Sequence, residues 1–387
     1  MIQDQQNQKK VRNGSAPVLR AALTASVAAC TLLSATPAFA LDQIVRPFYG
    51  IRAAGMGGTR ISTGLYDEVF YGNPARATEN PVARFDLMDL NLETSSDTLS
   101  NLSDLTQSGA EMLEALGDTA GRNSHVRIQS VFPAYHRPRS FGGQWAWSFG
   151  LIQNTQVDFA LRRSYRLDPQ VVVDIGPAFT VARRLLNESV SVGLTTHVAY
   201  RMSSNAGFSL ADLVQGKSLS PTDTGGDGAH IDFDLGALHK LNWKPRNWEF
   251  QLAGSVNNVL GGKYKNLGMQ QLSTGNLPIA QPRTYNVGLV AQRETAGPFE
   301  DVRLALELTD IGNNGGGSFY RLVHFGSEIR YGVLVPRFGI NQGYLTGGLG
   351  LDLKYWTLEL ATYGEEMSLL PGGLEDRRYA IRTQIRI

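Results

Sequence analysis

The chain has 387 residues, among them 36 Lys and Arg, 35 Asp and Glu and 42 Gly, and its formal net charge is +1. This balance, with the basic residues scattered along the chain, argues against a nucleic-acid partner. The single cysteine, Cys30, excludes a disulfide framework, and no thiolate metal site is expected.

Residues 1–40 predict an export signal. Basic side chains precede an almost uninterrupted apolar run at residues 21–33, and Pro37 ends that run. Small residues at positions 38 and 40 predict cleavage before Leu41. The run is too short to span a bilayer, which needs about 20 residues. An alternative is lipoprotein processing at Cys30, which ends the sequence Val-Ala-Ala-Cys.

Residues 41–82 match neither a strand nor a helix pattern. They contain a glycine-rich run with Gly55, Gly57 and Gly58, followed by the triplet Asn73-Pro74-Ala75. The glycine run lacks the preceding buried strand and the following crossover helix of a nucleotide-binding loop, so we reject that interpretation. We expect its glycines to allow tight backbone packing inside a barrel lumen.

Residues 83–387 show the alternation of β-strands and contain no apolar run long enough for a membrane helix. Trp145, Trp147 and Phe149, for example, alternate with Ala146 and Ser148. Alternation places the two sets on opposite faces of a strand, although a soluble β-sandwich would show the same local pattern. We expect strands at 83–95, 124–137, 142–163, 167–186, 188–203, 229–242, 248–259, 283–295, 300–310, 321–332, 333–341, 344–353, 354–364 and 378–386.

The lengths of the connections separate a barrel from a sandwich. Long connections follow odd-numbered strands and tight turns follow even-numbered ones, so the long loops share one rim, as in outer-membrane barrels. Trp243 and Trp248 flank a tight turn, where an interfacial aromatic girdle is expected; the alternative is that they are core tryptophans of a sandwich. These features predict an all-β fold, a transmembrane antiparallel β-barrel of about 14 strands in a Gram-negative outer membrane, in contact with its lipid. The expected extracellular loops are 96–123, 204–228, 260–282, 311–320 and 365–377.

Two stretches resemble a known family. The sequence Arg52-Ala-Ala-Gly-Met-Gly-Gly58, followed by Tyr71-Gly-Asn-Pro-Ala75, resembles the start of FadL-like outer-membrane proteins. That superfamily includes long-chain fatty acid and aromatic hydrocarbon channels, PorV-like secretion barrels and TraF-like proteins linked to plasmid transfer. The resemblance implies that residues 41–82 form a hatch inside the barrel, with Asn73, Pro74 and Ala75 in the place of the family's triplet. Residues 337–351 look more like the PorV-like and TraF-like branches, and so do residues 363–366 followed by Arg377-Arg378-Tyr379.

Charged residues occupy the polar face of several expected strands. The first interpretation is a salt-bridged lumen wall that holds the hatch. The second is a polar path for a ligand carboxylate, in which Arg303 or Arg330 binds the anion. The candidate lumen residues are Arg303, Glu307, Glu328, Arg330, Asp352 and Glu359.

The loop at 96–123 carries apolar residues at three- and four-residue intervals. This spacing predicts one or two short amphipathic helices, with Asp97 as a possible N-cap and an interruption near Gly109; a further short helix is expected at 210–214. In FadL-like channels such helices form a capture groove, which the resemblance implies here. The alternative is that the side chains pack onto the barrel rim. The candidates are Leu99, Leu102, Leu105, Met112, Leu113 and Leu116.

No catalytic, metal or cofactor motif stands out. The six histidines show no metal-ligand spacing, and no Ser–His pair is marked, so we expect neither an enzyme nor a metal or cofactor. The function predicted from the sequence is passive uptake of hydrophobic small molecules, fatty-acid-like or aromatic. The alternative is an accessory or structural barrel with a plugged lumen, which binds protein components of a secretion or conjugation system.

Overall fold

A computed structural model of the chain describes residues 48, 50–100, 123–139, 143–161, 166–204, 207–209, 224–266, 271–272, 275–367 and 372–387. The expected export signal and the alternative processing site at Cys30 lie outside these residues, and so does the short helix expected at 210–214. Among the residues that the structure describes, no helix is long and apolar enough to cross a membrane.

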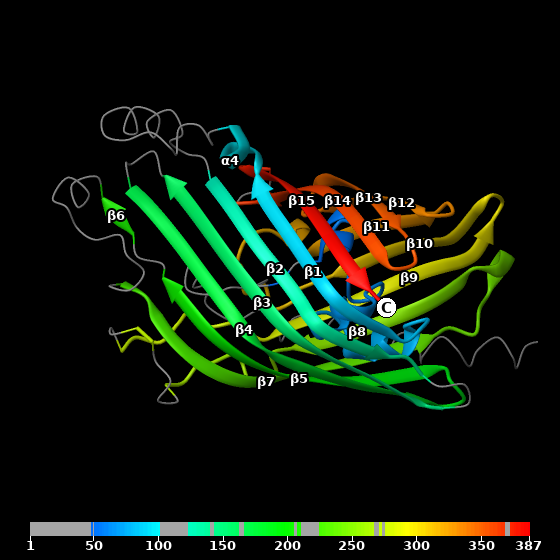
Figure 1. Cartoon of the computed structure of the whole chain (residues 1–387). Coiled ribbons are helices and arrows are strands. Elements are labelled where there is room, and N and C mark those ends of the chain that lie inside the picture. Colours follow the sequence, from blue (N-terminus) through cyan, green and yellow to red (C-terminus); the bar gives the residue numbers. More distant parts are fainter. Residues whose placement is uncertain are drawn as a thin grey trace, which may run out of the picture. The chain divides into compact units, whose positions relative to one another are not determined.

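The described strands form one closed antiparallel sheet (Figure 1). Apart from the short β6, which pairs with β4, each strand pairs with the next long strand along the chain, and the pairing of β1 with β15 closes the circle. The sheet has 15 strands; since β6 has only two residues, 14 long strands form the barrel, as the sequence predicted. The strands are β1 Arg84–Ser95, β2 Asn123–Arg137, β3 Trp145–Leu161, β4 Arg166–Leu185, β5 Val190–Ser204, β6 Phe208–Ser209, β7 Gly226–Lys240, β8 Glu249–Asn257, β9 Thr284–Ala296, β10 Phe299–Leu308, β11 Val323–Arg330, β12 Leu334–Asn341, β13 Tyr344–Asp352, β14 Trp356–Glu366 and β15 Glu375–Arg386.

Three sequence boundaries need correction. The expected loop 365–377 is shorter, because the β14–β15 ladder continues to the pair Glu366–Glu375. The expected loop 204–228 contains β6, which is too short to show alternation, and ends where β7 begins at Gly226. In the loop after β1, helix α4 (Ser96–Ser100) is capped by Ser95, whose hydroxyl accepts the N–H of Thr98, and not by Asp97, which lies inside the helix.

Side chains alternate between a polar interior and an apolar exterior. On β7 the inward-facing Asp232 is fully buried, whereas the neighbouring Ile231 is 53% exposed. The same division holds on β10, where Glu307 is buried and Leu306 is exposed. This is the reverse of a water-soluble protein, in which charged groups are exposed and large apolar ones are buried. A continuous apolar outer surface is the pattern of a barrel whose wall meets lipid.

The two rims of the barrel differ. Strands β2–β3, β4–β5, β7–β8, β9–β10, β11–β12 and β13–β14 are joined by short turns at one end, which we call the short-turn rim. The turn before β8 contains the 3-10 helix η4 (Pro245–Asn247). The opposite end, the long-loop rim, carries the connections after β1, β5, β8, β10 and β14, including the 3-10 helix η5 (Phe319–Leu322).

Exposed aromatic side chains gather at the short-turn rim. Trp243 is 61% exposed and stacks on Phe250 with ring centroids 5.0 Å apart. The alternative of a core tryptophan at position 243 is therefore wrong. A ring of aromatic side chains at one end of an apolar wall corresponds to the interfacial girdle of membrane barrels. The other exposed aromatic residues in or beside these turns are Trp145, Phe299, Tyr331, Tyr355 and Trp356.

Candidate functional site

Residues 50–80, which we call the luminal segment, lie inside the barrel (Figure 1, blue). They contain one short α-helix, α3 (Ile51–Gly55), and two 3-10 helices, η1 (Tyr66–Phe70) and η2 (Pro74–Glu79). Helix α3 contacts strands β12 to β15, and η2 contacts strands β3, β4, β5 and β7. Almost all of these residues are buried although they form little regular structure.

Glycines on both partners allow the first half of the luminal segment to press its backbone against the wall. A Cβ added at Gly326 of β11 would lie 2.3 Å from the carbonyl oxygen of Met56. One added at Gly339 of β12 would lie 2.5 Å from the nitrogen of Gly57, and Gly57 itself has a φ of +66°. The glycines at positions 55 and 57 therefore contact the wall directly, and Gly58, at φ +86°, lets the chain turn away.

The Asn73-Pro74-Ala75 triplet contacts the opposite wall. The side-chain oxygen of Asn73 accepts the N–H of Ala75 at 3.0 Å, and its amide donates to the carbonyl oxygen of Ala237 at 3.1 Å. Pro74 starts helix η2, where its missing N–H is not needed. A Cβ at Gly236 of β7 would lie 2.0 Å from the Asn73 oxygen, so that glycine is required for the contact.

Buried charges of the wall bind the luminal segment. Glu328 on β11 accepts two hydrogen bonds of 2.9 Å from Arg52, and it also pairs with Arg303 and Arg337 at 3.1 and 2.7 Å. Glu359 on β14 pairs with Arg337 at 2.9 Å. Each of these carboxylates is at most 6% exposed, so the pairs replace the lost hydration of their charges.

The other lumen candidates from the sequence are Glu307, which also binds the luminal segment, and Arg330 and Asp352, which bind each other. Glu307 accepts the N–H groups of three consecutive luminal residues, from Arg60 to Ser62. Arg330 and Asp352 form a 2.8 Å ion pair near the short-turn rim, and Arg386 also binds Asp352. Arg303 and Arg330, the two candidates for anion binding, are thus both paired with carboxylates of the wall. The capture-loop candidates are not brought together: Leu99 is exposed on α4, and the other five lie outside the described residues.

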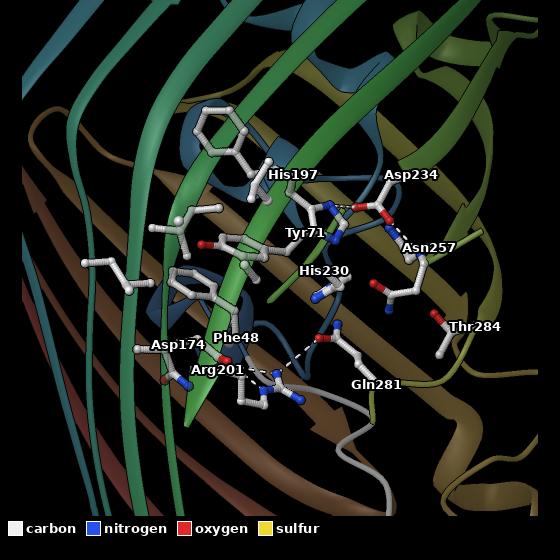
Figure 2. Close-up of a pocket in the computed structure, with 18 of the residues that line it drawn as sticks. Phe48, Tyr71, Asp174, His197, Arg201, His230, Asp234, Asn257, Gln281 and Thr284 are labelled. Atoms are coloured by element: carbon white, nitrogen blue, oxygen red, sulfur yellow. Dashed lines mark hydrogen bonds and ion pairs between the residues drawn. The ribbon is translucent and has the colours of Figure 1, made fainter. Parts of the chain in front are cut away.

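A cavity of about 70 Å³ lies in the lumen beside the luminal segment (Figure 2). One side of the cavity is lined by Phe48, Phe70 and Tyr71, from the N-terminal part of the chain. The rings of Phe48 and Tyr71 are stacked, with their centroids 3.8 Å apart. Strands β3, β4, β5, β7 and β8 provide the wall, and Gln281 and Thr284 the end toward the long-loop rim. Its wall residues include Ile152, Asp174, His197, Arg201, His230, Asp234 and Asn257.

The charged groups of the cavity are bound to one another. Arg201 donates to both oxygens of Asp174 at 2.6 and 2.9 Å, and its guanidinium lies 5.0 Å from the ring centre of Tyr264. Asp234 accepts the N–H of Asn258 at 2.7 Å and lies 3.6 Å from the His197 ring. The cavity therefore offers an apolar side and a polar side on which the strong charges are already compensated.

The hydroxyl of Tyr71 and both ring nitrogens of His230 are buried and have no hydrogen-bond partner among the described residues. Burial raises the pKa of Tyr71 well above its ordinary value, so its hydroxyl stays protonated. In the part of the chain that the structure describes, no group of three His, Cys, Asp or Glu side chains could hold a metal ion. The apolar and polar sides of the cavity can together accommodate a small molecule.

The lumen candidates Arg303, Glu307, Glu328, Arg330, Asp352 and Glu359 do not line this cavity. Its polar residues were recognisable only as inward-facing positions, because His197 and His230 alternate with apolar neighbours on β5 and β7. Their convergence with Arg201 and Tyr71 depends on the closure of the sheet around the luminal segment. The absence of metal-ligand spacing gave no reason to select these histidines.

The fold and the site define a closed 14-stranded antiparallel barrel with an apolar exterior, an internal N-terminal segment and a luminal cavity. No protein-family model matches the chain, and no curated protein matches it.

Among solved structures, the chain is similar to a deltaS2 mutant of the monoaromatic hydrocarbon channel TodX (14% identity, 87% of this chain and 97% of that chain, TM-score 0.49). It is also similar to the monoaromatic hydrocarbon channel CymD (14%, 89% and 98%, 0.48) and to a FadL homologue of Pseudomonas aeruginosa (10%, 89% and 98%, 0.45). The fold itself is established by the strand pairing.

Proposed function

We propose that this chain is an outer-membrane barrel for the passive uptake of hydrophobic small molecules. The observation that carries the proposal is the luminal cavity, which has an apolar side formed by Phe48, Phe70 and Tyr71 and lies within a barrel whose outer wall is apolar. The driving force is the transfer of apolar ligand surface out of water, about 25 cal/mol per Å².

The location in the outer membrane is part of this proposal. A barrel satisfies every backbone hydrogen bond within its wall, which hydrocarbon surroundings require. The exposed Leu306 and Ile231 would face lipid, and Trp243 would mark the interface at the short-turn rim. An export signal at residues 1–40 would deliver the chain, and the short turns would face the periplasm.

The luminal segment would act as a hatch that directs the ligand. The cavity borders Asn257, Gln281 and Thr284, which lie toward the long-loop rim. The luminal segment bounds it from the other side, so a ligand that enters from the long loops would be stopped there. Passage would then require either a movement of the luminal segment or an exit through the wall.

The β4–β5 ladder is interrupted beside the cavity, where a sideways exit would have to form. Ile175 of β4 pairs with Tyr200 of β5, and Ala178 pairs with His197. The two residues of β4 between these pairs, 176 and 177, are not paired with β5. One of these is Pro177, which has no N–H to donate. At this place the cavity is lined by Gly176 together with Ile175 and Val198, whose side chains are exposed on the outer face.

Filling the cavity tests the proposal. Ala199→Phe introduces a ring at a cavity-lining position, so uptake of a labelled apolar compound by cells producing the barrel should fall several-fold. Ala291→Phe is the matched control, since Ala291 lies on the outward face of β9. Equal uptake by wild type, both variants and cells without the barrel would contradict the transport function.

The buried ion pairs of the luminal segment favour a second function, an accessory barrel with a closed lumen. Arg52 is bound by Glu328 and by Glu68 at 2.9 Å, and such buried pairs resist separation. In that case nothing passes the lumen, and the rims bind proteins of a secretion or conjugation system. Absence of barrel-dependent uptake, combined with co-purification of defined protein partners, would support this function.

A further inference from the structure

One wall of the cavity carries a histidine whose hydrogen-bonding capacity is unused. His230 on β7 is 6% exposed, and neither ring nitrogen bonds to any residue that the structure describes. The ring is held edge-on by His197, with centroids 5.6 Å apart, and by Tyr264, at 4.3 Å. Figure 2 shows it pointing into the cavity, opposite Tyr71. A buried polar atom without a partner is costly, which indicates that something else supplies the partner.

The other side of the cavity suits an aromatic ring. The stacked pair of Phe48 and Tyr71, with an interplanar angle of 8°, lies beside Phe70 and Ile152. One water needs roughly 10–15 Å³ of cavity volume, and this cavity has a volume of about 70 Å³. It therefore has room for a few waters or for a group about the size of one ring.

The charges of the cavity disfavour an anion. The two arginines that line it are engaged, since Arg60 donates to the carbonyl oxygen of Phe48 at 2.9 Å and Arg201 binds both oxygens of Asp174. Two carboxylates, those of Asp174 and Asp234, also border the space and balance these two arginines, so a ligand carboxylate would meet no surplus of positive charge.

We propose that the cavity binds an uncharged single-ring molecule carrying one hydroxyl group, with the hydroxyl on His230 and the ring against Phe48, Tyr71 and Phe70. This inference rests on the proposed uptake function and narrows its substrate to phenol-like compounds. A neutral imidazole has one donor and one acceptor nitrogen, and a hydroxyl can pair with either, so the match does not depend on the tautomer.

Three compounds of similar size separate the possibilities: p-cresol, p-xylene, in which a methyl replaces the hydroxyl, and p-toluate, which is an anion. Binding is measured by equilibrium dialysis against the full-length barrel in lipid nanodiscs, with empty nanodiscs correcting for partition into lipid. We expect p-cresol to bind about fivefold or more tightly than p-xylene, and p-toluate to bind weakest.

Variants assign the preference to the histidine. His230→Phe keeps an aromatic ring but removes both nitrogens, so p-cresol affinity should fall to that of p-xylene, whose own affinity stays unchanged. His230→Gln, which can still donate and accept, should keep part of the preference. His239→Phe on the outward face of the same strand should behave as wild type. Heat-dependent migration in detergent gels checks that each variant is folded.

Equal binding of p-cresol and p-xylene to the wild type would overturn the inference, as would tightest binding of p-toluate or a preference that survives in His230→Phe. If no compound binds while uptake remains sensitive to Ala199→Phe, the substrate class is wrong and the uptake function stands. If neither binding nor barrel-dependent uptake is found, both proposals fail.

Discussion

The carboxylate of Glu307 on strand β10 accepts two hydrogen bonds from Ser62, one from its backbone N–H at 2.8 Å and one from its hydroxyl at 2.6 Å. The same carboxylate accepts the N–H groups of Arg60 and Ile61. One wall residue thereby satisfies three consecutive backbone donors of a segment that has no sheet or long helix of its own. This shows how an irregular segment is held in a fixed position inside the barrel.

Glu307→Gln should loosen the luminal segment. The amide group that replaces one carboxylate oxygen cannot accept, so buried donors lose their partner at a cost of about 1–3 kcal/mol. We expect faster proteolysis near residues 60–62 in the folded barrel, measured by mass spectrometry of the fragments. Ser62→Ala removes only the hydroxyl bond and should have a smaller effect. Wild-type cleavage rates in Glu307→Gln would show that these bonds do not hold the segment.

Glu328→Gln should destabilise the barrel more than a surface substitution of the same kind. It leaves Arg52, Arg303 and Arg337 around a neutral amide, and breaking a buried pair costs about 3–5 kcal/mol. Glu249→Gln is the control, since its partner Lys244 is 62% exposed and such pairs contribute about 0–1 kcal/mol. Denaturant unfolding of the folded barrel in detergent measures both. Equal unfolding midpoints for the two variants would contradict a structural role for Glu328.

Gly339→Ala should separate the luminal segment from the wall, because the new Cβ would lie 2.5 Å from the nitrogen of Gly57. Overpacking of this kind costs about 1–3 kcal/mol. Gly347→Ala on the next strand is the control, since a Cβ there has no neighbour within 4 Å. We expect a lower thermal midpoint for Gly339→Ala alone. Identical midpoints would show that the close backbone contact is dispensable.

Acid should weaken the attachment of helix η2. Burial by itself would raise the pKa of Glu79, but the charges of Arg76, Lys240 and Arg184 outweigh it and lower the pKa to about 2. A lowered carboxylate pKa stabilises the folded state above its unfolded value near 4.5, and that contribution is lost as the pH falls toward 2. Unfolding midpoints measured from pH 6 to pH 2 should fall less steeply in Glu79→Gln. Parallel pH profiles for the two proteins would refute the assignment.

Much of the barrel could be predicted from local sequence. Alternation predicted which side chains face the lumen, since successive side chains of a strand point to opposite sides. As predicted, Glu307 is buried in the lumen and Leu306 is exposed on the outer face. Sorting of connection lengths identified the two rims. The strand β6 was missed because two residues carry no period, and the ends of β14 and β15 were missed because a ladder can continue through polar residues such as Glu366. The start of β7 at Gly226 was missed as well.

The amino-acid sequence by itself determined that the chain alternates between lipid-compatible and polar faces over some 300 residues, because this pattern is local. Only the tertiary structure decided the contents of the lumen. Gly57 meets Gly339, Glu328 meets Arg52 and His230 lies opposite Tyr71 because closure of the sheet brings distant residues to one axis. No spacing along the chain encodes such encounters, since they depend on strand register and on the path of an irregular segment.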